Sequence, residues 1–466
     1  MGDLHVVVLA AGKGTRMRST VPKVLHPAAG LPLIGHILRT AESLHPKSTI
    51  IVVGHQAEQL KEAIGKRLGL GFASQEPQLG TGHALLQSEP LLQGARGTVL
   101  LLSGDVPLLR EETLERLVKA HQERSAAATV LTAVVESPHG YGRIVRDNGR
   151  IAAIVEDKDA SPAERAITEI NSGVYAFDLE PLFGALRSIG SANAQGEYYL
   201  PDLVRIYRAR GLPVETVTLD DRDEIRGVNS RKELAEVSTI LRARKNDELM
   251  AAGVTLVDPV TAYIDPEVTI GADTIVHPGV FLEGTTRIGS GCEIHSGVRI
   301  VNSTVEDRAV INNFCVIIDS HVASGAHLGP FAHLRPHSHV SENAKVGNFV
   351  ELKKTVLGRG SKASHLAYLG DATIGENVNV GAGTITCNYD GTAKHQTVIE
   401  DGAFIGSDSQ LIAPVRIGRG AYVAAGSSIT EDVPAESLAI ARGKQVNKEG
   451  WVKARRKTRP SEGAEK

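Results

Sequence analysis

Residues 268–300 read VTIGADTIVHPGVFLEGTTRIGSGCEIHSGVRI, and a repeat of six in this stretch decides the fold of the second half of the chain. From Val268 onward, every sixth residue is apolar, β-branched or a small cysteine. This first row contains Val268, Thr274, Val280, Thr286, Cys292, Val298, Thr304, Val310, Val316, Val322, Leu328, Leu334, Val340, Val346 and Leu352. A second row, two residues later, contains Ile270, Val276, Leu282, Ile288, Ile294 and Ile300. Six residues make one strand and one turn, so three such faces predict a triangular coil with these side chains inside.

Glycines punctuate the repeat, and two breaks interrupt it. The glycines at positions where we expect turns are Gly271, Gly289, Gly329 and Gly347. The register is broken at residues 358–371 and at residues 387–396. It resumes at Ile399, Ile405, Leu411, Ile417, Val423 and Ile429. Solenoids often place insertions on their binding side, so we expect chemistry at the two breaks. This half resembles the left-handed parallel β-helix of hexapeptide-repeat proteins.

The first half of the chain has a different pattern. Apolar runs at residues 6–10, 49–54, 98–105 and 128–136 alternate with amphipathic stretches. This alternation predicts an α/β fold, with a mostly parallel sheet flanked by helices. Ligands of such sheets bind beyond the carboxyl ends of the strands. Asn148-Gly149, between two apolar runs, predicts an antiparallel hairpin.

A charged helix separates the two halves. Ser230 and Glu233 have the spacing of a capping box, and apolar residues follow at helical intervals from Leu234. We therefore expect a linker helix that ends near Gly253. The predicted domains are residues 1–230, the linker helix at residues 231–253, and the β-helix with its tail at residues 254–466.

Composition excludes several classes of protein. The 466 residues exceed one ordinary core, and 42% hydrophobic residues with a net charge of -3 predict no nucleic-acid or membrane partner. Cys292, Cys315 and Cys387 include no CxxC pair, so we expect reduced thiols. The N-terminus has no basic region, and no stretch reaches the roughly eighteen apolar residues of a membrane span. We expect a cytoplasmic protein.

The turn after the first apolar run carries two glycines and two cations. Residues 9–17 read LAAGKGTRM. This is no Walker loop, because no GK[ST] follows, and no dinucleotide fingerprint, because Met17 replaces the third glycine. Glycines here let backbone amides approach phosphate oxygens, and Lys13 and Arg16 add positive charge. The alternative is an ordinary strand-to-helix turn with surface charges.

Further motifs follow in order along the chain: PKVLH, QLGTGHA, GDVP, GYGRI, EINSG, NAQGEYYLPD and GVNSR. With LAAGKGTRM they resemble the Rossmann-like nucleotidyltransferases that join a nucleoside triphosphate to a sugar 1-phosphate. Together with the repeat half, nearly the whole chain is similar to the bifunctional N-acetylglucosamine-1-phosphate uridyltransferases and glucosamine-1-phosphate N-acetyltransferases, the GlmU family. The resemblance implies acetyl transfer from acetyl-CoA to glucosamine 1-phosphate. Uridylyl transfer from UTP to N-acetylglucosamine 1-phosphate would follow, with release of pyrophosphate, toward peptidoglycan and lipopolysaccharide precursors.

At the uridylyl site, the resemblance implies that Lys13 and Arg16 stabilise the leaving pyrophosphate and that Lys23 contacts the reacting phosphates. Mg²⁺ favours oxygen ligands, and Asp105 and Asn229 would supply them. The alternative for Asp105 is a plain strand-end cap. The implied substrate contacts are Leu9, Ala10, Ala11, Gly12, Lys23, Gln75, Gly80, Thr81, Ser103, Gly104, Asp105, Gly142, Glu156, Asn171 and Asn229. Family members often have an aromatic residue where this chain has Ser103.

The acetyl site is implied by GNFVELKK, SHLAYLGD, GAGTITCNYDG, SDSQLIAP and AIARG. His365, in the first break, would be the general base, because imidazole titrates near neutral pH. Taken alone, a loop histidine is more often structural. The implied sugar-phosphate contacts are Arg335, Lys353, Tyr368, Asn379 and Lys394. The implied acetyl-CoA contacts are Ala382, Asn388, Tyr389, Ser407, Ala425 and Arg442. Ser364 stands before the histidine where a glycine is common.

Four further histidines share the six-residue step: His321, His327, His333 and His339. Some β-helices of this kind bind zinc through histidines for carbonic anhydrase chemistry. Each of these four precedes an inward position by one residue, so we expect all four to lie at turns or to point outward. A solvated or interface role is therefore favoured over zinc ligation.

The resemblance also implies a homotrimer with acetyl sites shared between chains. The basic tail WVKARRKTRP, from Trp451, would cover an acetyl site or a neighbouring chain, or form a solvated end. Two other functions stay open at this point. One is a nucleotidyltransferase with a single activity, whose β-helix only oligomerises or senses regulators. The other is a nucleotide-sugar-binding scaffold without turnover.

Overall fold

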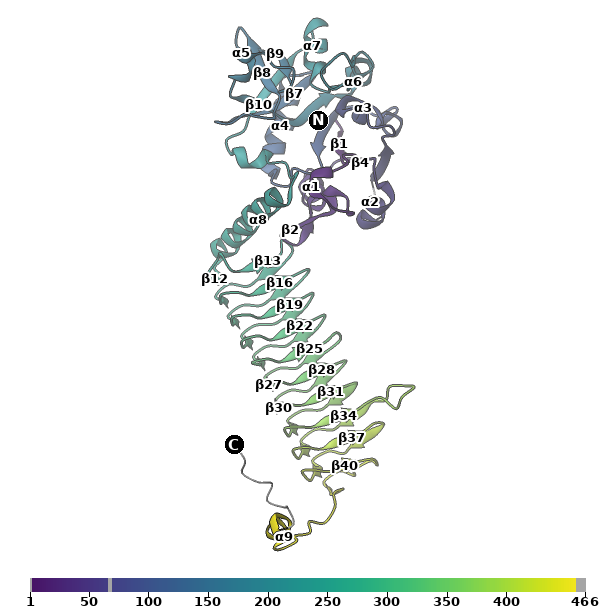
Figure 1. Cartoon of the computed structure of the whole chain (residues 1–466), viewed down its shortest axis with the longest axis vertical. Helices are drawn as coiled ribbons and strands as arrows, with labels where there is room; N and C mark the ends of the chain where they lie inside the picture. The colour runs from purple at the N-terminus through teal and green to yellow at the C-terminus, as the bar shows by residue number, and fades with distance from the viewer. Residues whose placement is uncertain (1, 66–68, 458–466) are drawn as a thin grey trace, which may run out of the picture. The chain divides into compact units, whose positions relative to one another are not determined.

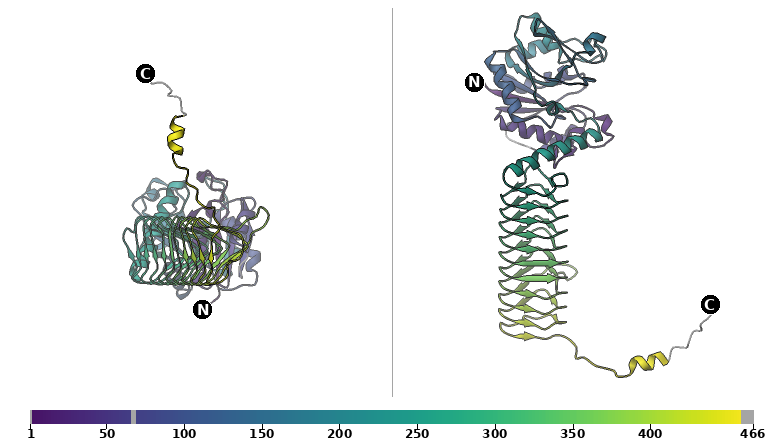
Figure 2. Two further views of the ribbon diagram at one scale, coloured as in Figure 1. Left: turned by 90° about the horizontal axis from the view of Figure 1, so that it is seen from below. Right: turned by 90° about the vertical axis from the view of Figure 1, so that its left-hand side faces the viewer.

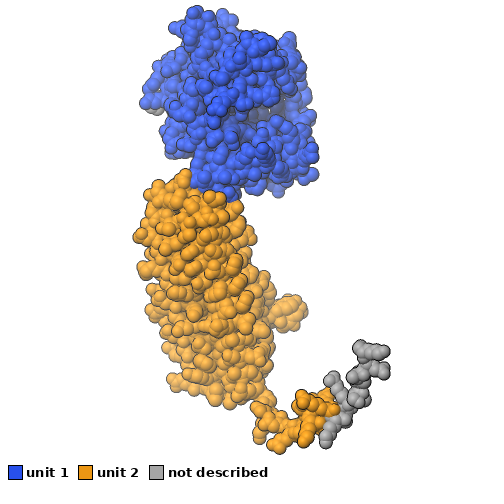
Figure 3. Space-filling view, turned by 60° about the vertical axis from the view of Figure 1, so that its left-hand side comes forward, with its two compact units in different colours: residues 1–245 blue, residues 246–466 orange. Residues whose placement is uncertain are grey.

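The structure is a computed structural model, and it describes residues 2–65 and 69–457. The chain divides into two units, residues 1–245 and 246–466 (Figure 3). The division falls inside helix α8 (Arg231–Ala251), which begins directly after Ser230. Among the described helices, none is both long enough and apolar enough to cross a membrane.

The first unit is built on a nine-stranded sheet (Figure 1). Its main path runs in the order β11-β7-β10-β6-β1-β4-β5. The strands are β1 (Leu4–Leu9), β4 (Ser48–Val53), β5 (Leu70–Ser74), β6 (Thr98–Ser103), β7 (Ala128–Val134), β8 (Arg143–Asp147), β9 (Arg150–Val155), β10 (Glu169–Asp178) and β11 (Val214–Thr218). Along this main path, neighbours pair in parallel except around β10, which is antiparallel to β6 and β7. The predicted, mostly parallel sheet is confirmed.

The hairpin predicted at Asn148-Gly149 is also confirmed. Strands β8 and β9 pair antiparallel, and Asp147 lies opposite Arg150. Asn148 and Gly149 both have positive φ, 48° and 78°, which the two-residue turn requires.

Helices cover both faces of this sheet. They are α1 (Leu33–Ser43), α2 (Ala57–Ile64), α3 (Thr81–Leu86), α4 (Glu111–Glu123), α5 (Pro162–Arg165), α6 (Leu179–Leu186) and α7 (Asp202–Ala209), with a small ribbon of β2 (Pro27–Ala28) and β3 (Leu31–Pro32). Val6, Val7 and Val8 are fully buried, and they alternate between two apolar clusters. An uninterrupted apolar run is thus explained by a strand that is covered on both faces.

The second unit is a coil of short parallel strands that form three sheets, and successive turns of the coil stack one below another (Figure 2). The first sheet contains β12 (Thr255–Leu256), β15 (Ile275–Val276), β18 (Glu293–Ile294), β21 (Val310–Ile311), β24 (His327–Leu328), β27 (Lys345–Asn348), β30 (Lys362–His365), β33 (Asn379–Val380), β36 (Phe404–Ile405), β39 (Tyr422–Val423) and β41 (Leu438–Ala439). The second contains β13 (Tyr263–Ile264), β16 (Phe281–Glu283), β19 (Arg299–Val301), β22 (Val316–Ile318), β25 (His333–Leu334), β28 (Glu351–Lys353), β31 (Tyr368–Gly370), β34 (Ile385–Cys387), β37 (Gln410–Ile412) and β40 (Ser428–Ile429). The third contains β14 (Thr269–Ile270), β17 (Arg287–Ile288), β20 (Thr304–Val305), β23 (His321–Val322), β26 (His339–Val340), β29 (Val356–Leu357), β32 (Ala372–Ile374), β35 (Thr397–Ile399) and β38 (Val415–Ile417). The predicted parallel β-helix of hexapeptide repeats is confirmed.

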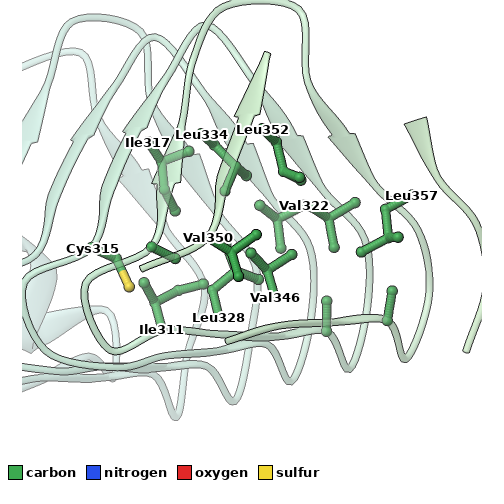
Figure 4. Close-up of a cluster of buried hydrophobic side chains, with 14 of the residues drawn as sticks. Ile311, Cys315, Ile317, Val322, Leu328, Leu334, Val346, Val350, Leu352 and Leu357 are labelled. Atoms are coloured by element: carbon green, nitrogen blue, oxygen red, sulfur yellow. The ribbon is translucent and has the colours of Figure 1, made fainter. Parts of the chain in front are cut away.

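The predicted first row is wrong in its middle part, because it mixes two rows of the coil. The coil from Arg287 to its pairing partner Thr304 contains one residue fewer than the coil from Ile275 to its pairing partner Glu293. The shorter coil moves the inward position along the chain by the same amount. Thr304, Val310 and Val316 are therefore only half-buried, and the fully buried row passes through Val305, Ile311, Ile317, Val322, Leu328 and Leu334. Figure 4 shows this row from Ile311 to Leu334.

One predicted break is an insertion, and the other is not. Between residues 358 and 371 the coil continues without a loop, and Leu357, Ala363 and Leu369 stay buried. The apparent break there is another of the shorter coils, since Val356 pairs with Thr373. The second break is a loop between β34 and β35, where Ile385 pairs with Gln410 and the coil is several residues longer than its neighbours.

Most of the predicted turn glycines serve close packing instead. Gly271, Gly289 and Gly347 lack positive φ, whereas Gly329 has a φ of 86°. A Cβ on Gly347 would lie 1.8 Å from the carbonyl oxygen of Ser364 in the next coil. Adjacent coils approach so closely there that no side chain fits between them.

The corrected register makes a direct prediction about stability. Ile311→Ala should lower the unfolding free energy by about 2–5 kcal/mol, because it leaves a cavity in the closed core. Val310→Ala, next to it on the outer side, should cost about 1 kcal/mol or less. Thermal unfolding followed by circular dichroism compares the two variants. Equal losses would contradict the register of the structure.

Candidate functional sites

Two adjoining cavities lie beyond the carboxyl ends of β1 and β6, where Leu9 pairs with Ser103. The first has a volume of about 430 Å³ and the second about 210 Å³. Of the predicted residues, the first cavity is lined by Leu9, Ala10, Ala11, Gly12, Lys13, Lys23, Gln75, Gly80, Thr81, Ser103 and Asp105. The second is lined by Leu9, Thr81, Ser103, Gly142, Glu156 and Asn171. The two cavities therefore share a wall, as two substrates that react with each other would require.

Three predicted polar residues meet in one cluster. The Lys23 ammonium donates to Asp105 Oδ2 in a short ion pair and to Asn229 Oδ1 at 3.1 Å. The Lys23 and Asp105 side chains are 13% and 23% exposed, so solvent screens this pair only partly. Sequence reasoning placed Lys23 on the phosphates. The structure shows it bound to the two proposed metal ligands.

Asn229 reaches this cluster because the start of α8 is fixed there. The Val228 amide donates to the Asp105 carbonyl at 2.9 Å. Next along the chain, the Asn229 amide donates to Glu233 Oε2 at 2.7 Å. The Ser230 hydroxyl accepts from the Glu233 amide at 3.3 Å, so the capping pair that starts the helix also positions Asn229.

The Asp105 and Asn229 oxygens fit a divalent cation. Both oxygens contact one positively charged atom, Lys23 Nζ, so they already converge on a point where a cation is stable. A carboxylate and an amide oxygen are hard ligands of the kind that Mg²⁺ prefers.

In the glycine-rich turn, Gly14 and Gly12 are needed for different reasons. Gly14 has a φ of 58°, and a Cβ there would lie 2.7 Å from Lys23 Cβ. Glycine is required for the turn to pack on Lys23. At Gly12, a Cβ would meet nothing within 4 Å, so the backbone is bare toward the cavity. Lys13 is exposed and lines the cavity, whereas Arg16 is exposed and is not among its lining residues.

Two glutamines, Gln75 and Gln78, line the first cavity and hold its loops in place. Gln75 is buried, and its amide nitrogen donates to the Gly80 carbonyl at 2.9 Å. Gln78 Nε2 donates to the Ala11 carbonyl at 2.5 Å and lines the first cavity. Gln78 was not predicted, although it opens the QLGTGHA motif. Its bond ties that motif to the glycine-rich turn.

Glu156 lies in an acidic, half-buried environment in the second cavity. Burial raises its pKa, and the neighbouring carboxylates of Asp159, Asp202 and Asp157 raise it further. The adjacent Arg143 is fully buried and donates to Asp157 Oδ1 at 2.8 Å. Sequence reasoning missed Arg143 and also Tyr175, which lines this cavity.

The raised pKa of Glu156 predicts how stability depends on pH. The folded state holds this proton more tightly than the unfolded state, so stability falls as pH rises above the ordinary pKa of 4.5. Glu156→Gln removes the charge and should raise the melting temperature at pH 7 to 8. Below pH 4.5 the two proteins should unfold alike. Thermal unfolding measures both melting temperatures. If their difference is the same below pH 4.5 as at pH 7 to 8, the raised pKa of Glu156 is contradicted.

In the second unit, His365 closes strand β30 and does not lie in a loop, which corrects the expectation. Its Nδ1 lies 2.7 Å from Asn348 Oδ1, in the paired strand one coil earlier. An amide oxygen only accepts, so Nδ1 is the nitrogen that donates, and in the neutral ring Nε2 is then the nitrogen with the free lone pair. Asn348 was not predicted. The signal that could have found it is its place one coil of the repeat before His365.

Most of the predicted acetyl-CoA residues form a ladder on successive coils. The Asp408 amide donates to the Ala382 carbonyl at 2.7 Å, and the Gly426 amide donates to the Ser407 carbonyl at 2.8 Å. Arg442 donates to the Ala425 carbonyl at 2.6 Å. Ser407 and Ala425 are exposed. The coil thus presents a continuous row of small residues.

Lysines gather where strands of the second sheet end. Lys353 Nζ donates to Asp371 Oδ2 at 2.9 Å, and Asn388 donates to the same oxygen. Burial raises the pKa of Asp371, but the bonds from Lys353 and Asn388 outweigh it, so the net shift is downward. Lys394 lies close to Lys353, and this neighbouring, positively charged amino group lowers the pKa of Lys394. Two adjacent ammonium groups with one carboxylate favour an added anion. Asp371 was not predicted.

The insertion loop that carries Lys394 is held by its own bonds. Asp390 Oδ1 accepts from the Thr392 and Ala393 amides at 2.8 and 2.7 Å, and His395 Nε2 lies 2.6 Å from Asp390 Oδ2. Tyr389 is exposed and bridges to Lys394 through the backbone.

The remaining predicted residues lie on two sheets. Arg335 donates to Glu351 Oε1 at 3.0 Å, and Glu351 pairs in register with Tyr368. Asn379 belongs to the first sheet, where it pairs with Lys362. No contact found among the described residues joins Asn379 to Lys353.

Comparison with known proteins finds a matching family model in each of the two units. Residues 6–170 match the family model described as MobA-like NTP transferase domain, and residues 396–431 match the model described as bacterial transferase hexapeptide (six repeats). Fold and sites together define a transferase with a nucleotidyltransferase unit and a hexapeptide-repeat unit. The bifunctional protein GlmU of Pelobacter propionicus is 51% identical over 460 residues, 98% of this chain and 100% of the relative. That of Trichlorobacter lovleyi is 53% identical over 451 residues, 97% and 98% of the two chains. The chain belongs to the GlmU family.

Proposed function

We infer that the chain is a bifunctional enzyme of UDP-N-acetylglucosamine synthesis. The β-helix unit transfers the acetyl group of acetyl-CoA to glucosamine 1-phosphate. The nucleotidyltransferase unit then transfers the uridylyl group of UTP to N-acetylglucosamine 1-phosphate. The observation that carries this inference is identity of 51% to a bifunctional relative over 98% of the chain, which includes both sites.

One assay tests both reactions. The purified chain receives glucosamine 1-phosphate, acetyl-CoA, UTP and Mg²⁺, and each component is omitted in turn. Without acetyl-CoA, both coenzyme A release and UDP-N-acetylglucosamine should stop. Without UTP, only the nucleotide sugar should be lost. Coenzyme A release with no uridylyl product under complete conditions would contradict the bifunctional assignment.

At the first site, a sugar-phosphate oxygen attacks the α-phosphorus of UTP while the bond to pyrophosphate breaks. Catalysis of this step is mostly positioning and charge neutralisation. Lys13 and Arg16 supply positive charge to the leaving group, and the bare backbone at Gly12 admits the phosphates. Asp105 and Asn229 would hold Mg²⁺, which supplies further charge neutralisation when bound. The second cavity, with Gly142, Glu156 and Asn171, takes the acetylated sugar.

At the second site, the amine of glucosamine 1-phosphate attacks the thioester carbonyl, the carbon–sulfur bond breaks, and coenzyme A leaves as a thiolate that takes up the proton that His365 has accepted from the amine. His365 Nε2 accepts the amine proton, because Asn348 holds the proton of the same ring on Nδ1. Lys353 and Lys394 bind the sugar phosphate, together with Arg335 and Tyr368. The ladder of small residues, with Asn388 and Tyr389, takes acetyl-CoA. Asn379, on the neighbouring sheet, completes the proposed set.

We also propose that the chain forms a homotrimer. Phe314, Phe331, Phe349 and Leu366 form an exposed apolar ridge along one corner of the coil, and each is at least 46% exposed. The phenylalanine rings stack at 5.3 and 5.2 Å. Phe349 follows Asn348 and Leu366 follows His365, so a second copy on the ridge would approach the acetyl site. Sedimentation should give a trimer, and Phe331→Asp should dissociate it. A monomeric active preparation would contradict this.

Two smaller expectations belong with this proposal. The three cysteines are unpaired in the described residues, which suits the reducing cytoplasm as the place of both reactions.

The tail forms helix α9 (Trp451–Lys457), with Arg455 above the Trp451 ring at 4.9 Å. Residues 458–460 of the predicted tail motif lie outside the described residues. We propose that the tail covers an acetyl site.

A further inference from the structure

On coils of the β-helix that carry none of the proposed acetyl-site residues, three side chains able to bind a metal converge on the outer surface. His277 and His295 occupy equivalent positions on successive coils, because β15 pairs with β18 through Val276 and Ile294. Their imidazole rings stack at 4.7 Å with an interplanar angle of 10°. Glu293 lies two residues before His295, so its side chain leaves the strand on the same face.

The distances between these groups are those of a metal site. Glu293 Oε1 lies 3.3 Å from His277 Nε2 and 3.3 Å from His295 Nε2. A tetrahedral zinc ion, with bonds of about 2.0–2.1 Å, separates its ligand atoms by about 3.3 Å. One ligand atom from each residue lies within 4.8 Å of the other two. The side chains are between 26% and 43% exposed, so an ion can enter from solvent.

We propose that His277, Glu293 and His295 bind a zinc ion, with water in the fourth position. Two imidazoles and one carboxylate are a donor set that suits Zn²⁺ and not Mg²⁺, which favours oxygen ligands only. This site is therefore chemically distinct from the Asp105 and Asn229 pair. Because its ligands come from two coils, the ion joins those coils and stabilises the folded unit.

A second stacked pair shows that stacking alone does not make such a site. The rings of His321 and His339 lie 4.6 Å apart, but their Nδ1 atoms face each other at 2.9 Å in a hydrogen bond. Glu306 contacts His321 on the other ring nitrogen, Nε2, at 2.9 Å. His339 and Glu306 thus contact opposite nitrogens of the His321 ring, so the three groups do not converge on one point. The outward orientation expected for His321 and His339 is confirmed, since the neighbouring Val322 and Val340 are buried. This pair supplies matched control variants.

The test titrates Co²⁺ into the full chain with Mg²⁺ in large excess, which occupies sites made of oxygen ligands alone. One Co²⁺ per chain should bind with the visible absorption of tetrahedral cobalt, and Zn²⁺ should displace it. Glu293→Gln and His295→Gln should each weaken binding at least about tenfold. His321→Gln and His339→Gln should bind like the unchanged protein.

A second measurement separates loss of the site from loss of the fold. Zn²⁺ should raise the melting temperature of the unchanged chain but not that of Glu293→Gln, and without metal the two should unfold alike. The proposal is overturned if the unchanged chain takes up no more Co²⁺ than Glu293→Gln. It is also overturned if His321→Gln loses as much binding as His295→Gln.

Discussion

His365→Ala is expected to lower acetyl transfer by about 10²–10⁴-fold, the usual contribution of a positioned general base. The substituted chain keeps its coil, because the side chain is exposed at the end of β30 and fills no core space. Coenzyme A release from acetyl-CoA and glucosamine 1-phosphate measures the loss. Uridylyl transfer to added N-acetylglucosamine 1-phosphate should be unchanged, since that chemistry lies in the other unit.

The matched control for this variant is His327→Ala. His327 also points outward from the first sheet of the coil, two strands away from β30, and is exposed. It should retain full acetyl transfer. Asn348→Ala should lose at least about tenfold, because the imidazole then lacks the partner that fixes its tautomer. Normal acetylation by His365→Ala would remove the base from our mechanism.

Asp105→Asn should lower uridylyl transfer by about 10²–10³-fold, the typical loss when one preorganised electrostatic group is removed. The amide nearly keeps the volume of the carboxylate but carries no negative charge, so Lys23 and any bound cation lose their counter-ion. Pyrophosphate release from UTP and N-acetylglucosamine 1-phosphate measures the effect. Raising the Mg²⁺ concentration should restore part of the activity if Asp105 binds the metal.

Asp147→Asn is the control for this second variant. Asp147 is an exposed carboxylate of the same unit, at the tip of the β8–β9 hairpin, away from both cavities. Its substitution should leave both activities intact, and Asp105→Asn should leave acetyl transfer intact. Equal uridylyl transfer by Asp105→Asn and the unchanged chain would refute the proposed role of Asp105.

Local patterns predicted much of the proposed uridylyl site, because its residues stand in short motifs at strand ends. Leu9, Ser103 and Asp105 follow from the rule that parallel strands end at one edge of a sheet. Other members could not be found this way. Arg143 and Tyr175 look like ordinary strand residues in the sequence. Only the packing of β10 brings Tyr175 to the second cavity, and only the fold brings Arg143 to Asp157.

The coil shows where periodicity stops being sufficient. A strict step of six misplaced Val310 and Val316, because some coils are shorter than three full repeats by one residue. A shortened corner changes which of two adjacent residues faces the core, and in this coil both residues are valines or isoleucines. Residue type therefore does not indicate which one is buried. Pairing with the coils above and below decides it.

The sequence by itself determined the class of each unit, since period and composition fix whether a segment can bury its apolar side chains as a strand in a sheet or as one side of a coil. It also determined the order of the motifs. Tertiary structure alone decided which distant groups meet: Asn348 with His365, Lys23 with Asn229, and Glu293 with His277. Those meetings depend on coil length and strand order, which set the distances between side chains that no single segment encodes.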